Sequence, residues 1–177
     1  MTTGYFETLK QAVIASSVSK HWGTAVLEWT VVDLEEDPSG RSMCVCGHPN
    51  LVQLFTIENV RNGELLRPIG NVCVKKFGRE DLNTELSVFS RLLKLRKAID
   101  AGEASFTSEY FSRALLHHLD TEGAFNPDQW DADGGYGFLV DMFNKTKKDD
   151  ITQKQHWKIS LLLKNKVFPF VQASGEA

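Results

Sequence analysis

The chain has 177 residues, of which 42% are hydrophobic and 24% charged, a composition typical of a globular protein with a hydrophobic core. Its net charge of -3 excludes a strongly basic protein that would attract nucleic acid over its whole surface. No apolar run reaches the roughly 18 residues of a membrane span, and the N-terminus lacks the basic and apolar regions of a secretory signal, so we expect a cytoplasmic protein with no membrane partner.

The first part of the chain predicts two helices and a strand. Residues 4–15 carry apolar side chains at helical spacing. Ser19 is a suitable N-cap for a second helix, in which Trp22 and Trp29 would lie on one apolar face and pack in the core. The β-branched segment 30–34 then predicts a strand.

A small antiparallel sheet is expected next. After an acidic turn, residues 43–45 can return antiparallel to the strand at 30–34. The apolar alternation from 51 to 69 is interrupted by Asn62-Gly63, which is a strong hairpin signal. We therefore expect three or four antiparallel strands.

All three cysteines lie at the ends of this hairpin. Cys44 and Cys46 precede it, and Cys73 follows it at the start of a short predicted helix. Thiolates are favoured zinc ligands, and an odd number of clustered cysteines does not suggest a secreted disulfide framework. We therefore predict one structural Zn²⁺ with four protein ligands, a site that has no open position for catalysis. The alternative is three buried free cysteines.

The fourth ligand is left open between two histidines. His48 is nearest to the cysteines in sequence and is the leading candidate, and His21, beside Trp22, is the alternative. Glu28 has two possible roles, as a structural residue or as a hydrogen-bond partner of a ligand histidine.

These motifs resemble a pattern in small uncharacterised bacterial and phage proteins. The resemblance covers residues 20–78 and rests on Trp22, Ala25, Glu28-Trp29, Cys44-x-Cys46-Gly47-His48, Phe55-x-Ile57-x-Asn59 and Gly70-Asn71-x-Cys73-Val74-x-x-Phe77. It implies a treble-clef-like zinc module with Cys44, Cys46, His48 and Cys73 at the matching positions. It implies no established activity.

A basic segment follows the last cysteine. Between residues 75 and 97 the chain has seven basic and three acidic residues, a net charge of +4 in a chain that is acidic overall. Such a segment beside a zinc module can contact phosphate groups. The candidate nucleic-acid-binding residues are Lys75, Lys76, Arg79, Arg91, Lys94 and Lys97. The alternative is a solvated helix face.

The rest of the chain predicts helices. They are expected from residue 84 to 99, from Thr107 to 119, from 137 to 143, and from a capping box at Thr152 to Pro169, with Trp157 buried on the last. The loop before the third of these helices is acidic and glycine-rich. Its segment 128–134 resembles a calcium loop only in part, because Gln129 and Val140 occupy ligand positions that require carboxylates, and we interpret it as a surface loop.

The predicted fold class is α+β: a small zinc-stapled, treble-clef-like antiparallel sheet with an N-terminal helix and a C-terminal helical region. We expect a zinc module at 1–78, helices packed on it at 79–172 and a tail at 173–177, all in one compact unit.

The sequence contains no nucleotide-binding loop, nucleophile elbow, zinc-protease or dinucleotide motif, and it indicates no small-molecule substrate. We therefore expect a non-enzymatic binding module that contacts nucleic acid or a nucleic-acid-handling complex. The alternative is a protein-interaction factor of the phage or mobile-element type that inhibits or modulates a host enzyme. In that case the acidic segments 33–37 and 128–133 would contact a basic partner surface.

Overall fold

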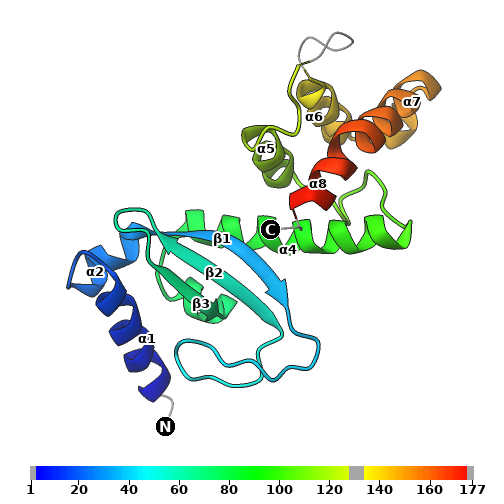
Figure 1. Cartoon of the computed structure of the whole chain (residues 1–177). Helices are drawn as coiled ribbons and strands as arrows, with labels where there is room; N and C mark the ends of the chain where they lie inside the picture. The colour runs from blue at the N-terminus through cyan, green and yellow to red at the C-terminus, as the bar shows by residue number, and fades with distance from the viewer. Residues whose placement is uncertain (1–2, 128–133, 175–177) are drawn as a thin grey trace. The chain divides into compact units, whose positions relative to one another are not determined.

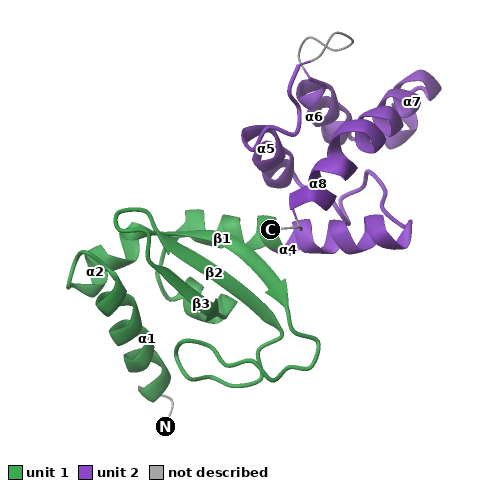
Figure 2. Cartoon of the chain, viewed as in Figure 1, with its two compact units in different colours: residues 1–89 green, residues 90–177 purple. Residues whose placement is uncertain are grey.

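The computed structural model describes residues 3–127 and 134–174 of the chain, and these are α+β as expected (Figure 1). The chain divides into two compact units, Met1–Phe89 and Ser90–Ala177 (Figure 2). The division falls inside one helix, α4 (Glu80–Ala101), whereas the sequence suggested a boundary after residue 78. At the C-terminus, helix extends to Ser174, so only residues 175–177 of the expected tail are left, and they lie outside the described residues.

The first unit contains the sheet. Its elements before α4 are α1 (Thr3–Ser16), α2 (Trp22–Ala25), the 3₁₀ turn η1 (Val26–Glu28), β1 (Trp29–Glu36), β2 (Gln53–Asn59), β3 (Leu65–Ile69) and α3 (Asn71–Lys75). Among the described residues the strands form one antiparallel sheet in the order β1-β2-β3. The strand pairing follows the chain order, as short antiparallel connections favour.

One face of this sheet forms the core of the first unit. Side chains point alternately to the two faces of the sheet along each strand. The side chains on the core face include four that are almost completely buried: Trp29, Phe55, Ile57 and Ile69. At the free edge of β1, Glu85 of α4 accepts hydrogen bonds from the Thr30 hydroxyl at 3.0 Å and from the Val31 N–H at 2.8 Å. A helix side chain thereby satisfies an edge-strand donor that would otherwise be open to another chain.

Two expectations for the first unit were wrong in detail. The second helix is only one turn long, because the chain is already extended at Trp29, so Trp29 is buried from a strand and not from a helix. Residues 43–45 do not pair with β1. Strand β2 takes that place, and the segment before the cysteines makes only an isolated bridge between Ser42 and Leu51.

The hairpin between β2 and β3 is confirmed, with a loop of residues 60–64. Gly63 has a φ of +77°, a conformation that glycine adopts without strain. Asn59 organises the loop, because its side-chain oxygen accepts hydrogen bonds from the N–H groups of Arg61 at 2.9 Å and Asn62 at 3.2 Å.

The second unit is helical. After α4 its elements are α5 (Arg113–Thr121), α6 (Tyr136–Asn144), the 3₁₀ turn η2 (Lys148–Asp150), α7 (Gln153–Leu162), the π-helical turn η3 (Leu163–Val167) and α8 (Phe168–Ser174). Among the residues that the structure describes, no helix is long and apolar enough to cross a membrane.

The helix boundaries in this unit agree with some of the starts and ends predicted from the sequence and differ from others. The capping box predicted at Thr152 is present, with Gln155 as its partner. Ser112, and not Thr107, is the N-cap of α5. Pro169 does not end the last helix: the wider π-helical turn precedes it and helix continues to Ser174, since such a turn can relieve the clash of a proline ring with the preceding backbone. Trp157 is 65% exposed and not buried as expected.

Candidate metal centre

The cysteines are presented by two different local structures. Cys44 and Cys46 lie in a tight turn, in which the Cys44 N–H donates to the His48 carbonyl at 2.9 Å and the Gly47 N–H donates to the Cys44 carbonyl at 2.8 Å. Gly47 has a φ of +95°, so the turn requires the conformational freedom of glycine. Cys73 lies in α3, directly after the hairpin. The fold therefore brings together residues 29 positions apart in the chain.

The three thiols have the spacing of a metal site. Their Sγ atoms all lie within 4.8 Å of one another, and the Sγ atoms of Cys44 and Cys73 are 3.7 Å apart. In a tetrahedral zinc site with Zn–S bonds of about 2.3 Å, two sulfur atoms are about 3.8 Å apart. The three cysteines are therefore close enough together to hold one metal ion, and cysteine sulfur is one of the donor types that zinc binds.

Backbone N–H groups point at two of the sulfur atoms. The Gly70 N–H donates to Cys44 Sγ and the His48 N–H donates to Cys46 Sγ, each at 3.4 Å. Such hydrogen bonds stabilise a thiolate relative to a thiol. Since metal ligation requires the thiolate form, the backbone around the cluster favours it.

The thiols also influence one another. The hydrogen bond between Cys73 and Cys44 lowers the pKa of Cys44 to about 5. The same hydrogen bond, followed by burial, raises the pKa of Cys73, and burial raises the pKa of Cys46. One thiolate therefore forms readily and opposes the ionisation of its neighbours, and a bound divalent cation would remove that opposition.

The two candidate histidines differ in position. His48 lines the same cavity of about 430 Å³ as the three cysteines, and its ring lies 5.3 Å from that of Tyr5. It is not part of the group of ligand atoms that lie within 4.8 Å of one another. His21 is exposed at the start of α2 and does not line this cavity. The described structure thus shows three converging ligands and places His48, not His21, beside them.

The predicted basic residues of the first unit have different surroundings. Lys75 and Lys76 are exposed on and directly after α3. Arg79 is less available than these lysines for a contact with phosphate, because its guanidinium donates to the carbonyls of Val26 at 2.9 Å and Trp29 at 2.6 Å. It also forms an ion pair with Asp81 at 2.5 Å. Arg79 therefore connects the start of α4 to the start of β1.

The other predicted basic residues belong to the second unit. Arg91 donates to the Ser108 carbonyl at 2.8 Å, and Lys94 lies 3.8 Å from the Glu109 carboxylate. Lys97 is exposed on the same helix. The structure thus assigns three of the six predicted nucleic-acid contacts to each unit, and several of them already bind groups of the protein itself.

Glu28 has a structural role that the sequence left open. Its carboxylate is buried and accepts hydrogen bonds from the N–H groups of Val18 and Ser19, both at 2.8 Å. Asn59 Nδ2 donates a third at 3.0 Å. Burial acts to raise the pKa of Glu28, but these hydrogen bonds, led by that from Asn59, outweigh it and leave the pKa lowered. The donors come from the α1–α2 connection and from β2, so Glu28 joins these segments.

No known protein family, curated protein or solved structure matches this chain. The resemblance to bacterial and phage proteins therefore stays a prediction from the motifs. The acidic segment 128–133 lies outside the described residues.

Proposed function

We propose that the first unit is a zinc-stabilised, non-enzymatic binding module, in which Cys44, Cys46 and Cys73 hold the ion and His48 completes its coordination. The observation that carries this proposal is the convergence of three thiols within 4.8 Å of one another. With four protein ligands, the ion would join the cysteine turn to α3 and leave no position for a substrate.

The order of local structures supports a treble-clef-like arrangement. A cysteine-containing turn is followed by the hairpin β2–β3 and then by α3, which carries the last cysteine. In such an arrangement the metal takes the place of a core that is too small to hold the turn and the helix together. The cavity beside the cysteines, lined by Tyr5, Leu51 and Val72 among others, shows that side chains do not fill this region.

The metal proposal is tested by zinc content and stability. We expect one zinc per chain by elemental analysis, and we expect Cys73→Ser to lose both the metal and thermal stability. Val72→Ser is a matched control, because its side chain is 64% exposed at the neighbouring position. His48→Ala should weaken zinc affinity and His21→Ala should not. A wild-type chain that is equally stable without metal would refute the proposal.

We further propose that the partner is nucleic acid, or a complex that handles it, and that Lys75 and Lys76 make the central contacts. Both are exposed beside Cys73, and Lys76 Nζ lies 5.7 Å from the Phe6 ring. Two adjacent cations, one at the end of a helix that a metal fixes and one directly after it, favour phosphate binding. Arg79 is assigned to the fold and not to this contact, because its guanidinium is already bound by backbone carbonyls.

A salt series tests the nucleic-acid partner. Fluorescence anisotropy with single- and double-stranded oligonucleotides should show an affinity that falls steeply with salt. The double variant Lys75→Glu, Lys76→Glu should reduce the slope of log affinity against log salt by about two, since each phosphate contact contributes about one. The double variant Lys147→Glu, Lys154→Glu, at two exposed sites of the second unit, makes the same change in net charge and is the control. Absent binding, or an unchanged slope in the double variant, would contradict this partner.

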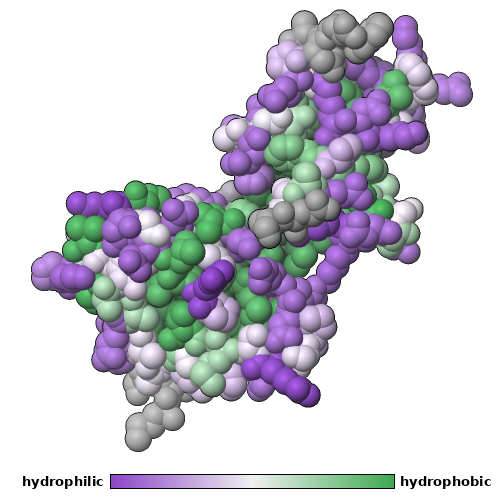
Figure 3. Space-filling view, in the orientation of Figure 1, coloured by the Kyte–Doolittle hydropathy of each residue, from purple (hydrophilic) through white to green (hydrophobic). Residues whose placement is uncertain are grey.

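Exposed apolar side chains favour a second candidate, a protein-interaction factor of the phage or mobile-element type that inhibits or modulates a host enzyme. Met43 and Val72, each adjacent to a cysteine, are 58% and 64% exposed, and Figure 3 shows apolar surface on the visible face of this unit. Apolar residues at this exposure are frequent in protein interfaces. Met43→Asp and Val72→Asp should then abolish binding to a purified partner enzyme while zinc content is unchanged. Retained binding in both variants would argue against this surface.

A further inference from the structure

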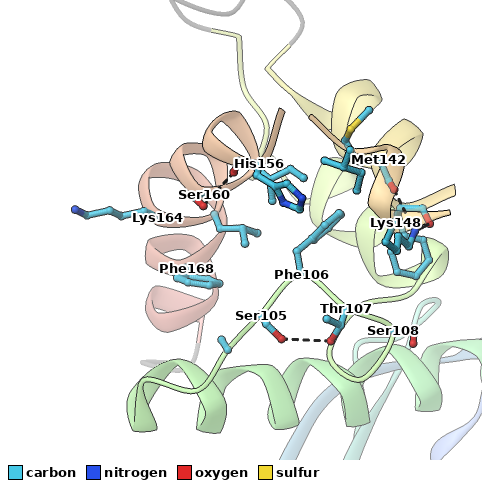
Figure 4. A pocket seen from close by; sticks show the side chains of 15 residues that line it. Ser105, Phe106, Thr107, Ser108, Met142, Lys148, His156, Ser160, Lys164 and Phe168 are labelled. Atoms are coloured by element: carbon cyan, nitrogen blue, oxygen red, sulfur yellow. Dashed lines mark hydrogen bonds between the residues drawn. The ribbon is translucent and has the colours of Figure 1, made fainter. Parts of the chain in front are cut away.

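The second unit contains a large cavity that the proposed zinc module does not explain. It has a volume of about 1030 Å³ and lies between the segment 104–108, the end of α6, and the helices α7 and α8 (Figure 4). It is open to solvent on one side, since several of its lining residues are exposed. Pockets for small molecules are typically about 300–1,000 Å³, so the cavity has the size of a ligand site.

Its walls are mainly aromatic and aliphatic. Phe106 projects into the cavity from the segment after α4, and Phe168 faces it from α8 (Figure 4). The Phe106 ring packs against the rings of Phe111 and Phe143, with ring centroids 5.1 and 5.9 Å away, and Phe143 also lines the cavity. This wall is preorganised for the apolar body of a ligand.

The polar groups at the cavity are basic or neutral. Among the described residues that line it, two are lysines and one is a histidine, and none is aspartate or glutamate, although the whole chain has a net charge of -3. His156 points toward the Phe106 side of the cavity, whereas the end of Lys164 points away from it (Figure 4). A negatively charged or hydrogen-bond-accepting group is therefore favoured over a cation.

Lys148 is the fixed cation of this wall. Its ammonium group donates to the carbonyls of Met142 at 3.2 Å and Phe143 at 2.5 Å, at the C-terminal end of α6. An ammonium group has three N–H donors, so these contacts orient it and leave a third donor for a ligand. Charge-assisted hydrogen bonds of this kind are stronger than neutral ones.

The backbone of the wall is also unusual. Leu163 and Lys164, which line the cavity, belong to the π-helical turn η3. Such turns have less favourable hydrogen bonding than α-helix and occur frequently at functional sites. This observation is independent of the size and charge of the cavity.

We propose that this cavity binds an amphipathic anion: a molecule with an apolar body against Phe106 and Phe168, and a carboxylate or similar acidic group near Lys148 and His156. The proposal does not depend on the zinc module, because every lining residue lies between positions 104 and 168.

Three amphiphiles with the same chain and different head groups test this site. Isothermal titration calorimetry would compare dodecanoate and dodecyltrimethylammonium, each below its critical micelle concentration, with dodecan-1-ol below its solubility limit. We expect one dodecanoate per chain, bound at least tenfold more tightly than the cation, which is the discrimination that one charge-assisted hydrogen bond supplies. Equal binding of all three compounds, or no binding of dodecanoate, would overturn the proposal.

Two pairs of variants locate the binding. Lys148→Gln should weaken dodecanoate binding about tenfold, because it removes one charge-assisted hydrogen bond. It should leave the affinity for dodecan-1-ol unchanged. Lys147→Gln, at a neighbouring position that does not line the cavity, should have no effect. Ser160→Trp should obstruct part of the cavity and weaken dodecanoate binding, whereas Lys154→Trp, elsewhere on α7, should not. Because Ser160 is exposed on the cavity wall, the folded state should tolerate tryptophan there. Unchanged dodecanoate binding in a folded Ser160→Trp variant would refute the site.

Discussion

Asn59 Nδ2 donates a 3.0 Å hydrogen bond to Glu28 Oε1 inside the first unit. Both side chains are buried, and the Asn59 oxygen accepts from two N–H groups of the hairpin loop. The pair therefore couples the loop between β2 and β3 to the connection between α1 and α2, whose N–H groups donate to Glu28. Buried polar groups of this kind fix one arrangement of the chain when all their partners are present.

Asn59→Ala tests this coupling. The substitution removes a donor to a buried carboxylate and leaves loop N–H groups without their acceptor, which should lower the free energy of unfolding by about 1–3 kcal/mol. Urea unfolding followed by tryptophan fluorescence would measure the change. Glu64→Ala, an exposed position of the same loop, should change stability by less than about 0.5 kcal/mol. Equal stability of the two variants would show that the buried pair is dispensable.

Asp37 should make stability depend on acid pH. Hydrogen bonds from the Ser39 and Ser42 hydroxyls lower its pKa from 3.8 to about 2. Because the folded pKa is the lower one, this contribution is complete above about pH 4 and is lost as the pH falls toward 2. Unfolding of wild type and Asp37→Asn should therefore differ above pH 4 and converge near pH 2. Glu35→Gln, at an exposed position of β1, is the control, and a difference that persists at pH 2 would contradict this explanation.

Arg79→Ala should destabilise the fold and not merely alter surface charge. The guanidinium donates to the carbonyls of Val26 and Trp29, and hydrogen bonds to charged groups contribute about 1.5–3 kcal/mol. We expect a loss of this size in thermal unfolding. Lys75→Ala, which removes an exposed cation nearby, should cost less than about 0.5 kcal/mol. If both variants were equally stable, Arg79 would return to the set of candidate phosphate contacts.

Thr152→Ala should weaken the start of α7. Thr152 accepts from the Gln155 N–H at 3.1 Å, and the Gln155 side chain accepts from the Thr152 N–H at 2.9 Å. Removing an N-cap hydroxyl costs about 0.5–2 kcal/mol. Amide hydrogen exchange should report faster opening of residues 153–156 in this variant. Thr146→Ala, an exposed threonine that precedes η2, should leave that exchange unchanged.

Local sequence signals predicted the features that neighbouring residues determine. The hairpin before Cys73 follows from apolar alternation interrupted by Asn62-Gly63, and the start of α7 follows from the capping box at Thr152. The clustering of Cys44 and Cys46 with Cys73 was also predictable, because a hairpin returns the chain to where it began. These predictions require only the geometry of segments close together in sequence.

The sequence could not decide features that depend on contacts between distant segments. Trp29 and Trp157 are both apolar residues at helical spacing, yet one is buried from a strand and the other is 65% exposed on a helix. Arg79 was predicted as a phosphate contact because nothing in its neighbourhood shows that the carbonyls of η1 and β1 would occupy its guanidinium. Side-chain burial depends on what the rest of the fold brings into contact.

The sequence by itself determined the ligand types of the candidate metal centre and the local elements that carry them. Only the tertiary structure decided how close the three thiols lie to one another and that His48 rather than His21 lies beside them. It also placed a largely apolar cavity between the segment 104–108 and the helices α6, α7 and α8, in a unit that the sequence described only as helical. The physical reason is that composition and periodicity determine which groups a segment carries, whereas distances between groups on different segments exist only after the chain has folded.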